Sequence, residues 1–261
     1  MIGNNRQLEI LDLLSEKGNV SVEELASIFN VSRMTIRRDL EKLQESNLLQ
    51  RTHGGALINK VLLHEMAYHE KREEHALAKQ HIATEAVKYV KNASIIYLDA
   101  GTTTYEVALK LPREGLTVIT NDIRIAAHLM LSNNTVIFLG GMILKDTGST
   151  TDQHSQMMLS EFNIDLAILA TSSIDNKLFL CTPDHDRQIM KQIALKQSEK
   201  SILVTDSSKF FSKSLYKIAP VTDFEAIITN LPIDKLLGAD LGSTEYIYVN
   251  TEHLDGGKII G

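Results

Sequence analysis

The stretch NVSRMTIRRDLEKLQESNLLQRTHGGAL, residues 30–57, gathers four arginines, one lysine and one histidine around a regular series of apolar side chains. The whole chain, by contrast, has 261 residues and a net charge of −6. Residues 30–60 hold six Lys/Arg against three Asp/Glu, whereas residues 61–261 hold 19 against 25. Positive charge confined to one segment is expected of a module that contacts phosphates with one face. The acidic remainder argues against a protein that coats nucleic acid everywhere.

Two helices are expected before the basic stretch. In residues 6–18, RQLEILDLLSEKG, apolar residues recur at helical spacing and a glycine follows, which is typical of an amphipathic helix with a glycine stop. In residues 21–30, SVEELASIFN, Ser21 and Glu24 match the capping box of a second helix. Asn30 suits the left-handed residue of a tight turn. Two helices joined by such a turn form a helix-turn-helix unit.

The helix after the turn is predicted to carry the basic face. Its apolar stripe consists of Ile36, Leu40 and Leu43, so at 100° per residue the arginines fall outside that stripe. The planar fork of arginine matches guanine or a phosphate bidentately, and hydroxyls in a first helical turn can hold a phosphate. We therefore predict that this helix contacts DNA through Ser32, Arg33, Thr35, Arg37 and Arg38.

A hairpin is predicted next, because two short extended runs flank Gly54 and Gly55 in residues 48–58, LLQRTHGGALI. A basic hairpin after a recognition helix is a wing, and Arg51 and His53 are placed to reach the minor groove or the backbone. Each feature alone is also compatible with a solvated charged helix and an ordinary hairpin. The capping box, turn, arginine face and basic hairpin in succession favour a DNA-binding domain over residues 1–58.

Residues 59–75 are predicted to be a linker and residues 76–261 an α/β domain. Short Val/Ile/Leu runs alternate with helical segments in the latter, which is the pattern of a largely parallel sheet covered by helices. The polar segment HEKREEHALAKQHIATEAVKYV, residues 69–90, is interpreted as a connecting helix. The histidines at positions 64, 69 and 75 do not align on one helix face, which disfavours a metal site.

Ligands of parallel sheets bind beyond the carboxyl ends of the strands, so polar residues directly after each predicted strand are candidates. In residues 99–104, DAGTTT, a helix start offers N–H groups, hydroxyls and a positive dipole end to an anion. Asp99 and Asp206 are candidates for sugar hydroxyls, and Lys191 or Lys209 for a phosphate. Each feature alone also fits an ordinary cap or turn. The predicted effector site comprises Asp99, Gly101, Thr102, Thr103, Thr104, Asn121, Gly140, Lys191, Asp206 and Lys209.

The motifs SRMTIRRDLEKLQ and RTHGGA, residues 32–44 and 51–56, resemble the N-terminal signature of the DeoR family of bacterial transcriptional regulators. The motifs YLDAGTTT, VITN, LGG and DSSKF, together with Lys191, resemble the signatures of that family's sensor domain. The resemblance implies a winged helix-turn-helix joined to an α/β domain similar in fold to ribose-phosphate isomerases and CoA transferases. It also implies a phosphorylated sugar as effector and a homodimer or homotetramer formed through the α/β domain.

The sequence departs from the family pattern at three positions where glycines are usual, namely Asp152, Ala170 and Ser173. The added side chains, one of them a carboxylate, are expected to alter the pocket and its choice of ligand. One winged helix reads only a short half-site, so specific binding of double-stranded operator DNA also calls for two-fold pairing of chains.

Three functions are compatible with the sequence. The favoured one is a repressor of a sugar-metabolism operon that is controlled by a phosphorylated sugar and is neither an enzyme nor dependent on a cofactor. The second is a sugar-phosphate isomerase with an accessory DNA domain, for which Asp99, Asp206 and Lys191 are the available acid and base groups. The third is a constitutive DNA-binding protein with an inactive pocket. No apolar run of about 18 residues occurs and no apolar leader follows Met1, so we expect a cytoplasmic protein without a membrane partner.

Overall fold

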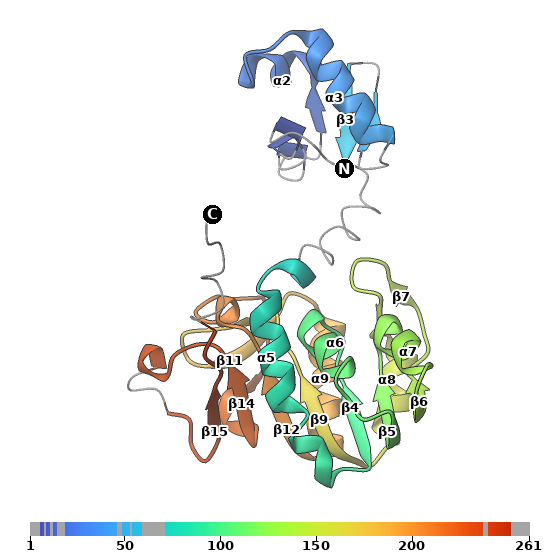
Figure 1. Ribbon diagram of the computed structural model, residues 1–261, viewed down its shortest axis with the longest axis vertical. Coiled ribbons are helices and arrows are strands. Elements are labelled where there is room, and N and C mark those ends of the chain that lie inside the picture. Colours follow the sequence, from blue (N-terminus) through green and yellow to red (C-terminus); the bar gives the residue numbers. More distant parts are fainter. Residues whose placement is uncertain are drawn as a thin grey trace, which may run out of the picture. The chain divides into compact units, whose positions relative to one another are not determined.

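The computed structural model forms two compact units, residues 1–70 and 71–261 (Figure 1). Each unit has its own hydrophobic core. No helix among the described residues is long and apolar enough to cross a membrane. The residues that the structure describes are 6–7, 9–10, 13–14, 19–45, 49–52, 54–58, 71–236 and 240–251.

The first unit is a helix-turn-helix with a small antiparallel sheet in the order β1-β3-β2. The described residues between positions 6 and 14 are helical. The other elements are β1 (Asn19–Ser21), α2 (Val22–Ile28), α3 (Arg33–Glu45), β2 (Leu49–Arg51) and β3 (Gly55–Ile58). The predicted apolar stripe of α3 is buried in the core of this unit, which confirms the expected orientation of the helix.

Short polar contacts set the ends of α2 and α3. The Glu24 N–H donates to Ser21 Oγ at 3.0 Å, and the Thr35 N–H donates to Ser32 Oγ at 3.1 Å. Asn30, in the turn between the helices, has a φ of 51°. These contacts confirm the predicted caps and the left-handed turn residue.

Strand β1 was not expected, because three residues are too few to show an alternating pattern. It pairs with β3 so closely that a Cβ at Gly55 would lie 2.0 Å from the Val20 carbonyl oxygen. The Val22 N–H also donates to the Gly54 carbonyl at 2.9 Å. The second glycine of the hairpin is therefore required by the close approach of the neighbouring strand.

The second unit is built on a seven-stranded sheet in the order β15-β14-β12-β9-β4-β5-β6, with every neighbouring pair parallel. The predicted parallel α/β domain is thus confirmed. The strands are β4 (Ile95–Leu98), β5 (Glu114–Thr120), β6 (Asn133–Phe138), β9 (Ile164–Leu169), β12 (Ser198–Val204), β14 (Ala226–Thr229) and β15 (Glu245–Tyr248).

Helices cover both faces of this sheet (Figure 1). One face packs against α5 (Ala76–Ala86), α6 (Thr102–Ala108) and α7 (Ile123–Leu129). The other packs against α8 (Gln153–Ser160), α9 (His185–Gln197) and a small sheet of β10 (Ser173–Ile174), β11 (Phe179–Thr182) and β13 (Tyr216–Pro220). The remaining elements are the hairpin β7 (Ile143–Leu144) and β8 (Ser149–Thr150) and the 3-10 turns η1 (Tyr89–Asn92), η2 (Ser207–Lys209), η3 (Val221–Asp223) and η4 (Ile233–Leu236).

The interpretation of residues 69–90 as a connecting helix was wrong. Helix α5 packs on α6 and on the sheet, and it buries Ala78, Ile82, Ala83 and Ala86 in the core. Its inward face consists largely of alanines, which give little hydrophobic contrast with a polar helix. The predicted linker lies outside the described residues up to position 70, and residues 71–75 belong to the second unit. The predicted domain limits otherwise stay a prediction.

Candidate functional sites

Helix α3 presents a basic outer face. The side chains of Arg33, Arg37 and Arg38 are exposed, and Thr35 is half-buried. The exposed Ser32 places its hydroxyl oxygen 2.9 Å from that of Thr35 at the helix start. This arrangement offers three guanidinium groups and two hydroxyls outside the core, as a helix that contacts DNA requires.

The hairpin is fastened to α3 by Arg51. Its guanidinium donates to Glu41 Oε1 at 2.8 Å, and its backbone N–H donates to Gln44 Oε1 at 3.3 Å. The Arg51 side chain therefore has an acidic partner on α3, and a contact with DNA would require it to share or leave that partner. His53 lies outside the described residues.

The order of the strands selects one point on the carboxyl edge of the large sheet. After β4 the chain continues to β5 and β6 on one side, and it then returns to β9, which lies on the other side of β4. Loops that leave neighbouring strands in opposite directions open a crevice between them. The loops at this crevice begin with Asp99 after β4 and with Ala170 after β9.

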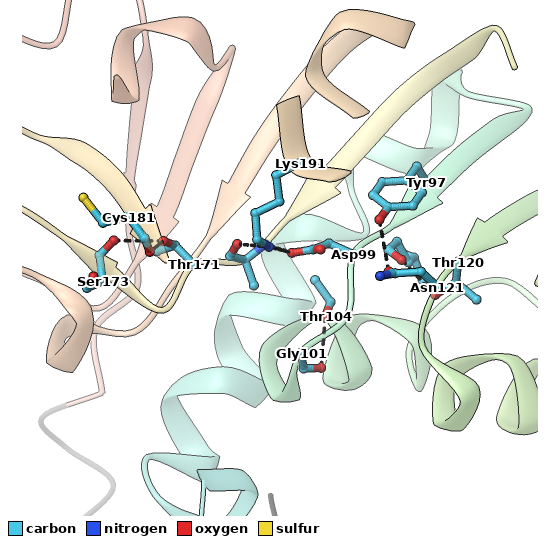
Figure 2. A network of polar contacts seen from close by, with 12 residues as sticks. Tyr97, Asp99, Gly101, Thr104, Thr120, Asn121, Thr171, Ser173, Cys181 and Lys191 are labelled. Carbon is cyan, nitrogen blue, oxygen red and sulfur yellow. Dashed lines mark hydrogen bonds and ion pairs between the residues drawn. The ribbon is translucent and has the colours of Figure 1, made fainter. Parts of the chain in front are cut away.

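A buried ion pair occupies this switch point (Figure 2). Lys191, from α9, donates to Asp99 Oδ2 and, at 2.8 Å, to the Ala170 carbonyl. The Ala170 N–H donates to the same Asp99 oxygen at 3.1 Å. Asp99 and Lys191 are only 3% and 6% exposed. A buried charge is tolerated when it is paired and hydrogen-bonded, and this cluster meets both conditions.

The threonine run lies beside this ion pair at the start of α6. The helix begins after Gly101, which has no side chain to cap it. The Thr104 hydroxyl donates to the Gly101 carbonyl at 3.0 Å (Figure 2). Thr103 and Thr104 are buried, whereas Thr102 is half-exposed. The first turn of α6 therefore has no side-chain cap that would compete with an anion for its N–H groups.

Asn121 and Gly140 are used within the protein. Asn121 is 1% exposed, accepts a hydrogen bond from the Tyr97 hydroxyl at 3.0 Å and donates to the Thr150 carbonyl at 2.9 Å. The Gly140 carbonyl accepts a hydrogen bond from the Ser155 hydroxyl at 2.5 Å. The Asn121 amide therefore supports the β7–β8 hairpin, and Gly140 supports the start of α8.

The carboxylate of Asp152, expected to be an added charge in the pocket, is held by backbone N–H groups. It accepts hydrogen bonds from the Ser155 N–H at 3.1 Å, as the cap of α8, and from the Met142 N–H at 2.6 Å. The bond from Met142, followed by that from Ser155, holds the pKa of Asp152 below its usual value. A Cβ at Gly141, where φ is 130°, would lie 2.4 Å from Asp152 Oδ1, so the position of this carboxylate requires a glycine at residue 141.

The other two departures from the family pattern lie nearer the switch point. A Cβ at Gly101 would lie 3.4 Å from the Ala170 Cβ, so the methyl group of Ala170 narrows the space beside the start of α6. Ser173 is buried, and its hydroxyl lies 2.8 Å from that of Ser214. Ala170 thus lies against the start of α6, whereas the Ser173 hydroxyl lies within hydrogen-bond distance of Ser214.

Asp206 and Lys209 lie beyond the end of β12, where Asp206 caps η2. One carboxylate oxygen accepts the Ser208 N–H at 3.0 Å and also contacts the Ser208 hydroxyl. The other oxygen is buried and has no hydrogen-bond partner among the described residues, although Asp206 is only 1% exposed. Such an oxygen is costly unless a ligand or solvent donates to it. Lys209 is half-exposed.

Two buried charged residues near this edge were missed from the sequence. Asp122 caps α7 by accepting the Arg124 N–H at 2.8 Å, while its second oxygen has no hydrogen-bond partner among the described residues. Burial raises the pKa of Asp122 to about 6. Lys79, on α5, is 2% exposed. The position of Asp122 directly after VITN could have identified it, but the polar surroundings of Lys79 in the sequence gave no sign of burial.

Comparison with known proteins agrees with both units. Residues 6–61 match the family model of the DeoR-like helix-turn-helix domain, and residues 74–231 match that of the DeoR C terminal sensor domain. The HTH-type transcriptional regulator GlpR of Haloferax volcanii is 32% identical over 235 residues, which cover 90% of this chain and 92% of that protein. The glycerol-3-phosphate regulon repressor of Escherichia coli is 31% identical over 225 residues, covering 85% and 89%.

Among solved structures, ribose 5-phosphate isomerase A from Methanocaldococcus jannaschii is 18% identical over 52% of this chain and 55% of that one, with a TM-score of 0.39. A likeness this distant bears on neither the details of the fold nor the activity. Matches to both family models and to relatives over most of their length carry the assignment. The chain belongs to the DeoR family of transcriptional regulators.

Proposed function

We propose that the protein represses a sugar-metabolism operon and that a phosphorylated sugar or a related metabolite, bound at the carboxyl edge of the large sheet, controls its binding to operator DNA. The observation that carries this proposal is the buried Asp99–Lys191 pair at the switch point, beside the start of α6. A cation and a helix N-terminus that lacks a side-chain cap favour an anionic group at the same place.

The neighbouring carboxylates favour hydroxyl groups on the same ligand. The unpartnered oxygen of Asp206 accepts hydrogen bonds, and sugar hydroxyls donate them. A ligand with a phosphate at one end and hydroxyls at the other satisfies both parts of the edge. Lys209, half-exposed beyond Asp206, is the alternative cation for the phosphate when the ligand binds in the reverse orientation.

The reported relatives favour a regulator over an isomerase with an accessory DNA domain, because both are regulators by name. The E. coli relative is named for glycerol 3-phosphate, which is a phosphorylated polyol. A ligand of that chemical class fits the mixture of cations and carboxylates described above.

The test combines thermal unfolding with DNA binding. Full-length protein is mixed with sn-glycerol 3-phosphate, D-ribose 5-phosphate or D-fructose 1-phosphate, and with glycerol, ribose or fructose as matched controls. At 100 times its dissociation constant a ligand stabilises the folded protein by about 2.7 kcal/mol. We expect one phosphate ester, but not its parent polyol, to raise Tm and change the affinity for DNA flanking the protein's own gene. Turnover of ribose 5-phosphate, or DNA binding that no phosphate ester alters, contradicts the proposal.

We further propose a homodimer or homotetramer, since one helix-turn-helix reads only a short half-site. Light scattering of the full chain measures its mass directly. A monomer at the concentrations that saturate the operator contradicts this part.

A further inference from the structure

The second unit begins with a short helical turn at residues 71–73, directly after the segment that leads from the helix-turn-helix unit in the sequence. His75 follows with a φ of 54°, and α5 starts at Ala76. The chain therefore bends sharply between the short turn and α5. Residues 71–75 are called the junction below.

The ammonium group of Lys79 holds this bend together. It donates to the Lys71 carbonyl and, at 2.6 Å, to the Glu74 carbonyl. Lys79 is 2% exposed, so its charge depends on these carbonyls and on nearby carboxylates instead of water. A cation at the carbonyl end of a helical turn also interacts favourably with the negative end of the turn's dipole. Lys79 is therefore a positioning residue for the junction.

The charges around Lys79 come partly from the candidate effector site. Burial lowers the pKa of Lys79, and the charge of Asp206 is the largest influence that raises it again. Lys209 opposes the charge on Lys79, whereas Glu74 and Glu106 favour it. Asp206, like Asp122, also has a buried oxygen without a hydrogen-bond partner among the described residues. The same carboxylate thus favours the charged form of Lys79, and its Oδ2 can still accept a hydrogen bond from a ligand.

A second connection runs through α6. Arg72, in the junction, lies with its Nε 3.8 Å from Glu106 Oε1 and its Cζ 4.8 Å from the centre of the Tyr105 ring. Tyr105 and Glu106 follow the threonine run on the same short helix. Figure 1 shows α5 beside α6, and the two helices pack against each other. Helix α6, at one proposed end of the effector site, therefore contacts the junction directly through Arg72.

We propose that Lys79 and Arg72 couple the effector site to the junction, so that a ligand at Asp206 and α6 changes how firmly the backbone of residues 71–75 is held. A ligand hydroxyl that donates to Asp206 shares the negative charge that favours the Lys79 ammonium, and it thereby weakens the charge-assisted hydrogen bonds from Lys79 to the carbonyls of Lys71 and Glu74. When Lys79 holds those carbonyls less firmly, the backbone of the junction is less constrained. The junction is the part of the second unit that follows the DNA-binding unit in the sequence. This inference rests on the proposed function and names the route of its regulation.

The first test needs no ligand. Hydrogen exchange is measured on the full chain for the wild type, for Asp206→Asn and for Asp234→Asn, a matched change at an exposed aspartate. We expect Asp206→Asn to change exchange in the peptide covering residues 71–80 at least about threefold, because the variant removes a negative charge that favours the Lys79 ammonium, and Asp234→Asn to leave it unchanged. The coupling is overturned if the Asp206→Asn variant exchanges in that peptide as the wild type does.

The second test separates ligand binding from its consequence. Lys79→Met removes the charge, and Lys88→Met removes a comparable charge from a side chain that is 59% exposed. The probe is whichever of the three phosphate esters named above acts on the wild type. Effector coupling is typically about 5–150-fold in affinity. We expect the Lys79→Met variant to bind operator and phosphate ester but to lose most of the ester's effect on operator affinity. The Lys88→Met variant is expected to keep that effect.

Arg72→Ala provides the same test if Lys79→Met does not fold, because the Arg72 side chain is 41% exposed. Equal responses in the wild type and in the folded variants overturn the inference while leaving the proposed function intact. If no phosphate ester acts on wild-type protein, the proposed function fails, and the ligand-free exchange experiment still decides whether Asp206 and the junction are coupled.

Discussion

The two candidate sites of this protein place their charged groups in opposite ways. On α3 the arginines are exposed, and Arg33 retains 66% of its side-chain surface. At the carboxyl edge of the large sheet the charged groups are buried against one another, and Lys191 retains only 8%. The candidate DNA-contacting face is thus open to solvent even where Arg33 pairs with Glu23 at 3.3 Å, whereas the charges of the candidate effector site are neutralised by buried partners. A ligand at that edge must compete with contacts that the protein already makes.

The largest effect predicted by this contrast concerns Lys191→Met. The change leaves Asp99 buried without its cation, and breaking a buried pair in this way costs about 3–5 kcal/mol. Urea unfolding of the second unit measures the loss. The double variant Lys191→Met/Asp99→Leu is expected to recover part of it, since no buried charge then remains. A loss below about 1 kcal/mol in the single variant would mean that the edge is not held by this pair.

A second prediction uses the pKa of Asp122, which burial raises from 3.8 to about 6. The folded state then binds a proton that the unfolded state has released, so stability falls as pH rises from about 4 to about 6 and levels off above. A shift of this size corresponds to about 2–3 kcal/mol. Asp122→Asn can still cap α7 but does not titrate. The wild-type minus variant difference in unfolding free energy should therefore fall across that window, and a difference independent of pH counts against the burial of a lone carboxylate.

The two glycines of the hairpin give a third prediction, for the DNA-binding unit. An added methyl group at Gly55 meets the Val20 carbonyl, whereas none of the described atoms lies within 4 Å of the Cβ position of Gly54. Gly55→Ala is expected to destabilise the first unit by about 1–3 kcal/mol through overpacking, and Gly54→Ala to change little. Thermal unfolding of both variants checks this. Equal effects would show that β1 does not press on the hairpin.

The smallest effects on stability are expected on α3. Arg37→Ala and Arg38→Ala remove exposed side chains that lie outside the apolar stripe, so Tm should not change. A lost base contact costs about 1–3 kcal/mol of binding and relaxes sequence preference, while a lost phosphate contact weakens binding to all DNA. Titrations against operator and unrelated duplexes distinguish these roles. Unaltered operator affinity removes the residue from the DNA-contacting face.

The same contrast explains what could be predicted from the sequence. Caps at Ser21 and Ser32 and the turn at Asn30 are local, because each depends on residues within a few positions. The parallel sheet was also predictable, since near-continuous Val/Ile/Leu runs leave few other arrangements. Strand β1 escaped because it depends on a partner strand whose residues lie far along the chain.

The contacts within the candidate effector site could not be predicted, because they join residues that are distant in sequence. Asp99 and Lys191 were both identified as candidates, but their pairing spans 92 positions. Asp152 is expected to add a carboxylate to the pocket, but its hydrogen bonds with the Met142 N–H and the start of α8 do not follow from the sequence. Lys79 was assigned to a solvated connector because alanines line the buried face of α5. Side-chain partners in a parallel sheet are set by strand order, which one sequence does not reveal.

The central claim is that an anion bound at the start of α6 controls operator binding, and Thr102 offers the most direct measurement. Thr103 and Thr104 are buried, but Thr102 is half-exposed in the first turn, where a carboxylate is compatible with the helix dipole. Operator affinity is titrated against the active phosphate ester for the wild type, Thr102→Glu and Thr102→Gln. We predict that Thr102→Glu requires at least about tenfold more ester because its carboxylate repels the phosphate, while Thr102→Gln stays near the wild type. A wild-type response from both variants would contradict the claim and place the anion elsewhere.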